Sequence, residues 1–294
     1  MVKTRQLSIA AIGNVPLREV SGLGQRRDAA REAAEVLAVG DNEFALMLAD
    51  VDELADGGGF RSVDLRQVIG HPAPSEGSEW EAADGDATGR VFILQESPAR
   101  VFVLNDGLDS VAHAIDLRLD DRERAELNWD ASSNARAEGL VLLQNGHLLV
   151  AKEKDPPLLM EFGPMGERAG GLAPELLFAS LGEFPLQSDA RSDFSLLSFW
   201  RLESEAGRRI GDFSDVAAGP DQRLYVLSDE SRCIAQMDLS LTPSRASFGI
   251  TELWELPDAL RQPEGLVVRE DMVPIVAIDK DEPSENLFVM TPLG

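Results

Sequence analysis

Four acidic residues occupy equivalent positions in this chain, each at the start of a short apolar segment. They are Glu81, Glu138, Asp215 and Glu264. Carboxylates that converge on one place repel one another unless a counterion or a raised pKa relieves the repulsion. A hard cation such as Ca²⁺, which takes six to eight oxygen ligands, would relieve it. We predict that these four residues hold one divalent cation, Ca²⁺ first among the candidates; alternatively they cap loops by accepting backbone N–H groups.

A second set of polar residues marks the ends of the apolar segments that follow. Asp41, Glu96, Asp229 and Lys280 lie at such ends, and Lys152 lies one residue before another. We expect these five side chains to contact a ligand. Lys152 and Lys280 could bind an anion or polarise a carbonyl group, or form salt bridges that balance nearby acids. Asp41 and Asp229 are candidates for water-mediated contacts to the cation.

No sequence motif points to a particular reaction. The chain has no Gly-x-Ser-x-Gly elbow and no P-loop, and His71, His113 and His147 share neither metal-binding spacing nor a common repeat position. Two functions remain open. One is a non-catalytic module that binds a small molecule or a basic protein segment. The other is a metal-dependent hydrolase of lactones or phosphate esters, in which an acid such as Asp229 acts as general base.

The elements that must position these residues are clearest between Ala137 and Pro157, which reads AEGLVLLQNGHLLVAKEKDPP. Asn145-Gly146 predicts a tight turn, because a type I′ hairpin needs two residues that tolerate positive φ. The apolar runs 140–143 and 148–151 on either side have the length of strands buried on both faces. This stretch therefore predicts a β-hairpin.

The hairpin recurs, and five segments align on it: residues 21–48, 81–104, 138–162, 215–237 and 264–290. Each has two apolar strands, a polar cluster and a third strand. The first copy carries RRDAAREAAE, which we interpret as a short helix-like insertion. Fourth strands are expected at 60–68, 113–119, 194–202 and 248–256, and the alternation of HAIDLRL indicates a half-exposed edge strand.

Four-stranded units repeated radially define a β-propeller, so we predict an all-β chain with one propeller domain of five four-stranded blades over residues 1–294. The fifth unit lacks a fourth strand, and we expect residues 6–13 to supply it and close the ring. Six blades, with one hidden between Phe162 and Ile210, and a two-sheet sandwich are the alternatives.

The charge and composition of the chain limit the kinds of molecule that it is expected to bind. Lys and Arg total 27 against 52 Asp and Glu, a net charge of −25. Such a surface disfavours nucleic acid and anionic membranes, and no apolar run reaches the roughly 18 residues that a membrane span needs. The single cysteine, Cys233, fits a reducing compartment. We expect a cytoplasmic monomer.

The motifs AEGLVLLQNGHLLVAKEKDPP, DVAAGPDQRLYVLSDESR and QPEGLVVRE resemble the SdiA-regulated family of bacterial β-propellers over about Ser78 to Met290. The resemblance departs at Ala83 and at Asp215-Val216. It implies the propeller fold. It also implies a cation site, since the gluconolactonase-like and phytase-esterase-like relatives bind a divalent cation in the channel. It implies no particular substrate, because propellers host many functions.

Overall fold

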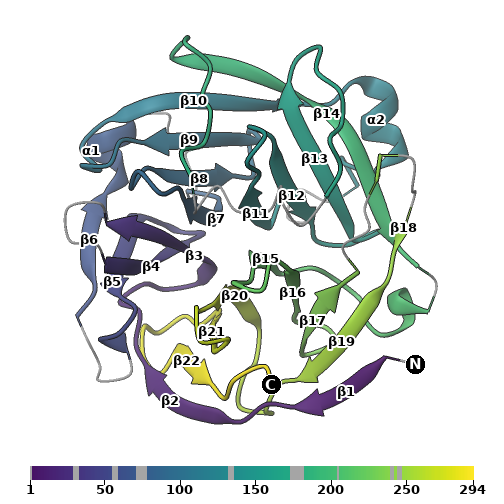
Figure 1. Ribbon diagram of the computed structural model, residues 1–294. Helices are drawn as coiled ribbons and strands as arrows, with labels where there is room; N and C mark the ends of the chain where they lie inside the picture. The colour runs from purple at the N-terminus through teal and green to yellow at the C-terminus, as the bar shows by residue number, and fades with distance from the viewer. Residues whose placement is uncertain are drawn as a thin grey trace.

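The computed structural model describes residues 2–28, 33–54, 59–70, 78–131, 136–172, 182–203, 205–238, 242–243 and 247–294. These residues form an all-β structure in which groups of strands surround a common centre (Figure 1). Its helical elements are short: α1 (Leu65–Ile69), α2 (Asp121–Glu126) and the 3₁₀ turn η4 (Ala206–Arg208). No helix in this part of the chain is long and apolar enough to cross a membrane.

The first half of the chain builds two groups of four antiparallel strands. The first group is β3 (Val20–Asp28), β4 (Ala33–Gly40), β5 (Glu43–Asp50) and β6 (Arg61–Asp64). The second group is β7 (Trp80–Gly85), β8 (Val91–Gln95), β9 (Arg100–Leu104) and β10 (Val111–Arg118).

The third group joins the second through its outer strand. It consists of β11 (Gly139–Leu142), β12 (Leu148–Lys152), β13 (Leu158–Pro164) and β14 (Arg191–Leu202). β14 pairs with β13 and also runs parallel to β10, so both groups belong to one sheet, to which β18 (Ser247–Phe248) adds a short strand. Segment 113–119, predicted as an edge strand, is therefore paired on both sides.

The remaining strands combine both ends of the chain. One sheet contains β15 (Asp215–Ala218), β16 (Leu224–Ser228), β17 (Cys233–Met237), β19 (Ile250–Glu255) and β1 (Lys3–Gln6). The other contains β20 (Pro263–Val268), β21 (Pro274–Ile278), β22 (Leu287–Met290) and β2 (Ile9–Gly13). β1 runs parallel to β19, whereas β2 runs antiparallel to β22.

The strands β3, β7, β11, β15 and β20, called the first strands below, lie nearest the centre and contact one another in this cyclic order (Figure 1). Glycine allows the closest of these approaches. A Cβ atom on Gly24 of β3 would lie 1.8 Å from the backbone oxygen of Ala83 in β7. The backbones of β3 and β7 therefore pack with no side chain between them at this point.

Apolar layers fill the space between neighbouring groups. One layer combines Phe92 and Leu94 of β8 with Leu148 and Val150 of β12. The second strands β8, β12, β16 and β21 are buried along their whole length, as the apolar runs predict. The hairpin at Asn145-Gly146 forms, but its turn is not the expected type I′. Gly146 has a φ of 84°, whereas Asn145 does not have positive φ, and the turn is closed by a hydrogen bond from the Gly146 N–H to the Leu143 oxygen.

The helix-like insertion predicted in the first hairpin is wrong wherever the structure describes it. β3 and β4 stay paired out to Asp28 and Ala33. Arg26 and Glu35 face each other across these strands in an almost fully buried ion pair of 2.8 Å. The tertiary pairing of β3 with β4 outweighs the weak helix preference of an Ala-, Arg- and Glu-rich segment.

Candidate functional site

The candidate site lies where the first strands begin. Their antiparallel pairing places each start opposite the end of the second strand: Trp80 faces Gln95, Gly139 faces Ala151, and Asp215 faces Leu227. Acids that begin a first strand therefore lie near acids that follow a second strand. Five glutamates interact in this region, and we call them the carboxylate cluster: Glu81, Glu96, Glu138, Glu153 and Glu264.

Glu81 and Glu138 form the centre of the cluster. Each carboxyl acts on the pKa of the other, Glu81 as a hydrogen-bonding neighbour of Glu138. Burial raises the pKa of both carboxyls well above the usual range, and neighbouring acids raise it further: Glu138 acts on Glu81, and Glu96 acts on Glu138. A hydrogen bond between two carboxyl groups requires a proton on one of them, because an ionised carboxylate only accepts.

Glu264 reaches the cluster from β20. Burial raises its pKa well above the usual range, and Glu138 is the carboxylate that raises it most. Glu96 is buried, and its Oε1 accepts a hydrogen bond from the backbone N–H of Arg136 at 2.8 Å. Three of the four acids predicted to share an ion thus interact with one another.

The fourth, Asp215, has different partners. Its Oδ1 accepts from the N–H of Val216 and its Oδ2 from the N–H of Leu266, each at 2.7 Å, and Leu23 donates a further backbone hydrogen bond. Burial nevertheless raises its pKa well above the usual range. Asp215 therefore links β15 to β20 and β3. It accepts backbone N–H groups, as in the alternative to cation binding, but the donors lie on strands and not in loops.

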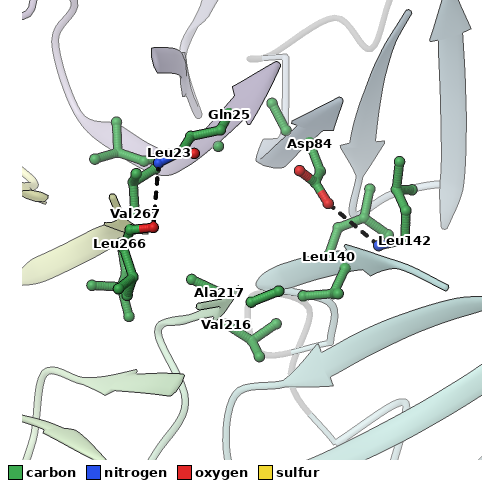
Figure 2. A pocket seen from close by; sticks show the side chains of 14 residues that line it. Leu23, Gln25, Asp84, Leu140, Leu142, Val216, Ala217, Leu266 and Val267 are labelled. Carbon is green, nitrogen blue, oxygen red and sulfur yellow. Dashed lines mark hydrogen bonds between the residues drawn. The ribbon is translucent and has the colours of Figure 1, made fainter. Parts of the chain in front are cut away.

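Asp84 plays a similar part in β7, and the sequence analysis missed it. It lines a small central cavity of about 60 Å³, together with apolar residues of the first strands (Figure 2). Its carboxyl accepts from Gly85 N at 2.9 Å and from Leu142 N at 3.3 Å. Burial raises its pKa to about 7. An acid inside an apolar first strand was the signal that could have identified it.

Asp41 and Asp229, which follow second strands, border the cluster: Asp41 acts on Glu81, and Asp229 acts on Glu264. Burial raises the pKa of both carboxyls, with Glu19 adding to the effect on Asp41 and Asp212 adding to that on Asp229. Asp212, which precedes β15, is a second residue that sequence reasoning missed. Its buried carboxylate accepts hydrogen bonds from Ser228 Oγ and from the backbone N–H groups of Asp229 and Glu230.

Two lysines act on Glu153 of the cluster: Lys154 through a direct contact, and Lys152 only through its charge. Lys154 Nζ lies 2.6 Å from Glu153 Oε1, and this contact raises the pKa of Lys154. Lys152 is buried, donates to the backbone oxygen of Lys154, and has its pKa lowered by burial. Lys280 donates to the backbone oxygen of Ser284 at 2.6 Å.

Other chemically capable groups lie elsewhere. His147 Nδ1 is 2.6 Å from Glu161 Oε1, and His113 Nε2 is 2.8 Å from Ser192 Oγ on the outer strands β10 and β14. His71 is outside the described residues. Within the described ranges, no three His, Cys, Asp or Glu side chains are arranged to ligate one metal ion together.

Comparison with known structures identifies the fold class. The fold is propeller-like: glutaminyl cyclase from Myxococcus xanthus matches with a TM-score of 0.52 at 11% identity, over 99% of this chain and 98% of that one. A streptogramin B lyase matches with a TM-score of 0.48 at 10% identity, over 97% of each chain. At 11% identity, the likeness to the glutaminyl cyclase concerns the fold alone.

The family follows from the sequence itself. Residues 73–283 match the SdiA-regulated family, and the chain belongs to this family. The match covers the second strand group through most of the last one, which includes the whole carboxylate cluster. No curated protein matches the chain.

Proposed function

We propose that the chain is a five-bladed propeller in which β2 completes the last blade and closes the ring. The antiparallel pairing of Ile9–Gly13 with Leu287–Met290 supports this arrangement. The cyclic contacts of the first strands support the count of five. In this arrangement the starts of the first strands surround one mouth of the central channel, and the carboxylate cluster makes that mouth acidic.

The function that this mouth supports best is ligand binding with a divalent cation. The observation that carries the proposal is the contact between the carboxyls of the buried Glu81 and the partly buried Glu138. Without a cation, burial and the neighbouring acids raise the pKa of both carboxyls and so favour keeping a proton on the pair. A divalent cation would replace that proton, and binding would release it to solvent.

The donor chemistry fits a hard ion, because every acidic group in the cluster offers oxygen. Glu81 and Glu138 would hold the ion, with Glu264 beside them. These carboxylates supply fewer oxygens than the six to eight ligands that Ca²⁺ takes, so the ion would keep several waters. An incoming ligand could displace those waters, so the bound ion would supply a positively charged anchor at the mouth.

The ligand is then a small molecule with oxygen donors, or a basic protein segment that competes with the cation for the acids. Lys154 and Asp229 would line its path, because both interact with the cluster. A hydrolase of lactones or phosphate esters is the alternative. Asp229, with its raised pKa, would be its general base.

Thermal unfolding of chelator-stripped protein tests the cation. An ion at 100 times its dissociation constant stabilises the native state by about 2.7 kcal/mol, which should raise the Tm by roughly 5 °C or more. We expect this rise with millimolar Ca²⁺ in the wild type and not in a Glu138→Gln, Glu264→Gln double variant. The control is Asp258→Asn, whose side chain is 93% exposed. An equal shift in wild type and double variant would contradict the proposal.

Turnover separates binding from hydrolysis. The wild type is incubated with a panel of lactones and phosphate esters, with Ca²⁺ or with chelator. We expect no turnover under either condition. Turnover that requires the cation and disappears in Asp229→Asn would instead establish the hydrolase.

A further inference from the structure

A second pocket, outside the channel, gathers positive charge. It has a volume of about 240 Å³ and lies between the β9–β10 pair and α2. Four of its lining residues are arginines: Arg100, Arg118, Arg124 and Arg136. Only two carboxylates, Glu96 and Asp116, line it with them. In a chain with a net charge of −25, this local excess of arginine stands against the general trend.

The arrangement around Asp116 shows how the charge is held. Asp116 is buried, and one carboxylate receives three guanidinium groups: Arg100 Nε at 2.5 Å, Arg191 Nε at 2.8 Å and Arg118 Nη2 at 3.2 Å. Burial alone would raise the pKa of Asp116, but the hydrogen bonds from Arg191 and Arg100 outweigh it and lower the pKa. A single charge of −1 therefore fixes three positive groups in place.

The join between β10 and β14 explains why these residues meet. The two strands run parallel, with Asp116 opposite Asp193 and Ala114 opposite Arg191. Asp193 accepts from Arg118 Nε at 2.8 Å, and Asp130 pairs with Arg124, but both of these acids are about half exposed. Solvent screens such exposed pairs, so they compensate the arginines only weakly.

Two of the arginines are held in partly buried positions. The Arg100 side chain is 18% exposed and the Arg136 side chain is 20% exposed. Among the described residues, Arg100 donates from Nε to Asp116, and no described protein acceptor meets its terminal nitrogens. Arg136 donates from Nε to the backbone oxygen of Trp129 at 3.2 Å, and its Nη2 lies 3.9 Å from Oδ1 of the half-exposed Asp130. Both guanidiniums are thus positioned in advance, with donors left for a ligand.

The rest of the lining is apolar. Trp129 is almost fully buried in the hydrophobic layer that also holds Leu117, and Pro98, Ala99 and Leu119 complete the wall. A pocket that combines fixed guanidinium forks with an apolar wall suits an anion attached to an apolar group. Phosphate fits the forks because arginine binds its oxygens in pairs.

We propose that the pocket between β10 and α2 binds a small phosphate monoester with an apolar substituent, through Arg100 and Arg136 and against Trp129. This site is independent of the proposed cation site, although Glu96 borders both. Glu96, a member of the carboxylate cluster, accepts a hydrogen bond from the backbone N–H of Arg136 and so helps to position this residue at the edge of the pocket.

Calorimetric titration with phenyl phosphate tests the proposal. The full chain is freed of divalent ions and chelator, because chelators are themselves anions, and ionic strength is held constant with NaCl. We expect saturable binding of one molecule per chain. Inorganic phosphate, which lacks the apolar group, and benzoate, which carries a single charge, should each bind at least several-fold more weakly.

Matched arginine variants locate the site. Arg100→Gln and Arg136→Gln should each weaken phenyl phosphate binding at least tenfold. Arg232→Gln, which removes an exposed arginine paired with Asp258 elsewhere, should leave it unchanged. Because Arg100 also neutralises Asp116, Arg136→Gln carries the test if Arg100→Gln fails to fold. Absence of saturable binding, or wild-type affinity in these pocket variants, would overturn the proposal. Calcium binding is measured separately, so failure of one site leaves the other standing.

Discussion

Glu81 and Glu138, which begin neighbouring strand groups, bring their carboxyl groups into hydrogen-bonding contact. Glu81 is the second residue of β7 and Glu138 directly precedes β11, so the contact results from the arrangement of these two first strands side by side. Burial and nearby acids make the doubly ionised pair unfavourable. The doubly ionised pair therefore destabilises the folded protein, and a bound cation, a proton or a substitution can relieve this destabilisation.

The first prediction concerns a substitution that removes the repulsion between the two carboxylates. Glu138→Gln should raise the stability of cation-free protein at pH 8 by about 1 kcal/mol, or roughly 3 °C in Tm. Because folding raises the pKa of Glu138, its contribution is favourable at low pH and is lost as the pH rises. The gain should therefore shrink at pH 5. Asp258→Asn is the exposed control and should change stability by less than 0.5 kcal/mol, as surface substitutions usually do. A lower Tm for Glu138→Gln at pH 8 would show that the pair stabilises the fold.

The second prediction concerns Asp84. Its pKa is raised by burial from 3.8 to about 7 in the folded protein, so its stabilising contribution is complete below pH 3.8 and is lost as the pH rises through 7. Between pH 5 and pH 8, the wild type should lose about 2–3 kcal/mol more stability than Asp84→Asn, since the amide does not titrate. Urea unfolding at both pH values measures this difference. Parallel losses would mean that Asp84 titrates normally.

The third prediction concerns Asp215. Asp215→Ala removes the acceptor of three backbone N–H groups on β15, β20 and β3. Leaving buried donors unpaired should cost about 3–5 kcal/mol in urea unfolding. Asp215→Asn keeps one acceptor oxygen and should cost about half as much. Asp271→Ala, at an exposed acid, is the control. A loss below about 1 kcal/mol for Asp215→Ala would mean that water replaces the carboxyl.

Asp215 also shows where sequence reasoning reaches its limit. The repeat correctly aligned it with Glu81, Glu138 and Glu264, because the period of the hairpins fixes which residues begin a first strand. The alignment could not say where the shorter aspartate side chain points. In the structure it binds the backbone of neighbouring first strands, whereas the three glutamates reach one another.

The same limit explains Lys152 and Lys154. Both follow the apolar run of β12, and the sequence marks the strand end there. Which lysine meets the acids depends on the turn after the strand, which the repeat does not specify. The parallel pairing of β10 with β14 was also unpredictable from the repeat. The two strands are far apart in the sequence, since 72 residues lie between Arg118 at the end of β10 and Arg191 at the start of β14. Strand positions were thus readable, but contacts between distant segments were not.

The fourth prediction tests ring closure. Deleting residues 1–13 removes β1 and β2, which pair with β19 and β22. The exposed edges of β19 and β22 would offer unpaired backbone groups to other chains. We expect aggregation, or a monomer with a substantially lower Tm, in light scattering and thermal unfolding. A monomeric truncated protein with an unchanged Tm would contradict closure by this segment.

The most direct test of the cation site is calorimetric titration of chelator-stripped protein with CaCl₂ at pH 7, in two buffers of different ionisation enthalpy. We predict one Ca²⁺ per chain and a buffer-dependent heat that reports proton release from the Glu81–Glu138 pair. Both signals should disappear in a Glu81→Gln, Glu138→Gln double variant. Absence of saturable binding in the wild type, or unchanged binding in the double variant, would contradict the proposed function.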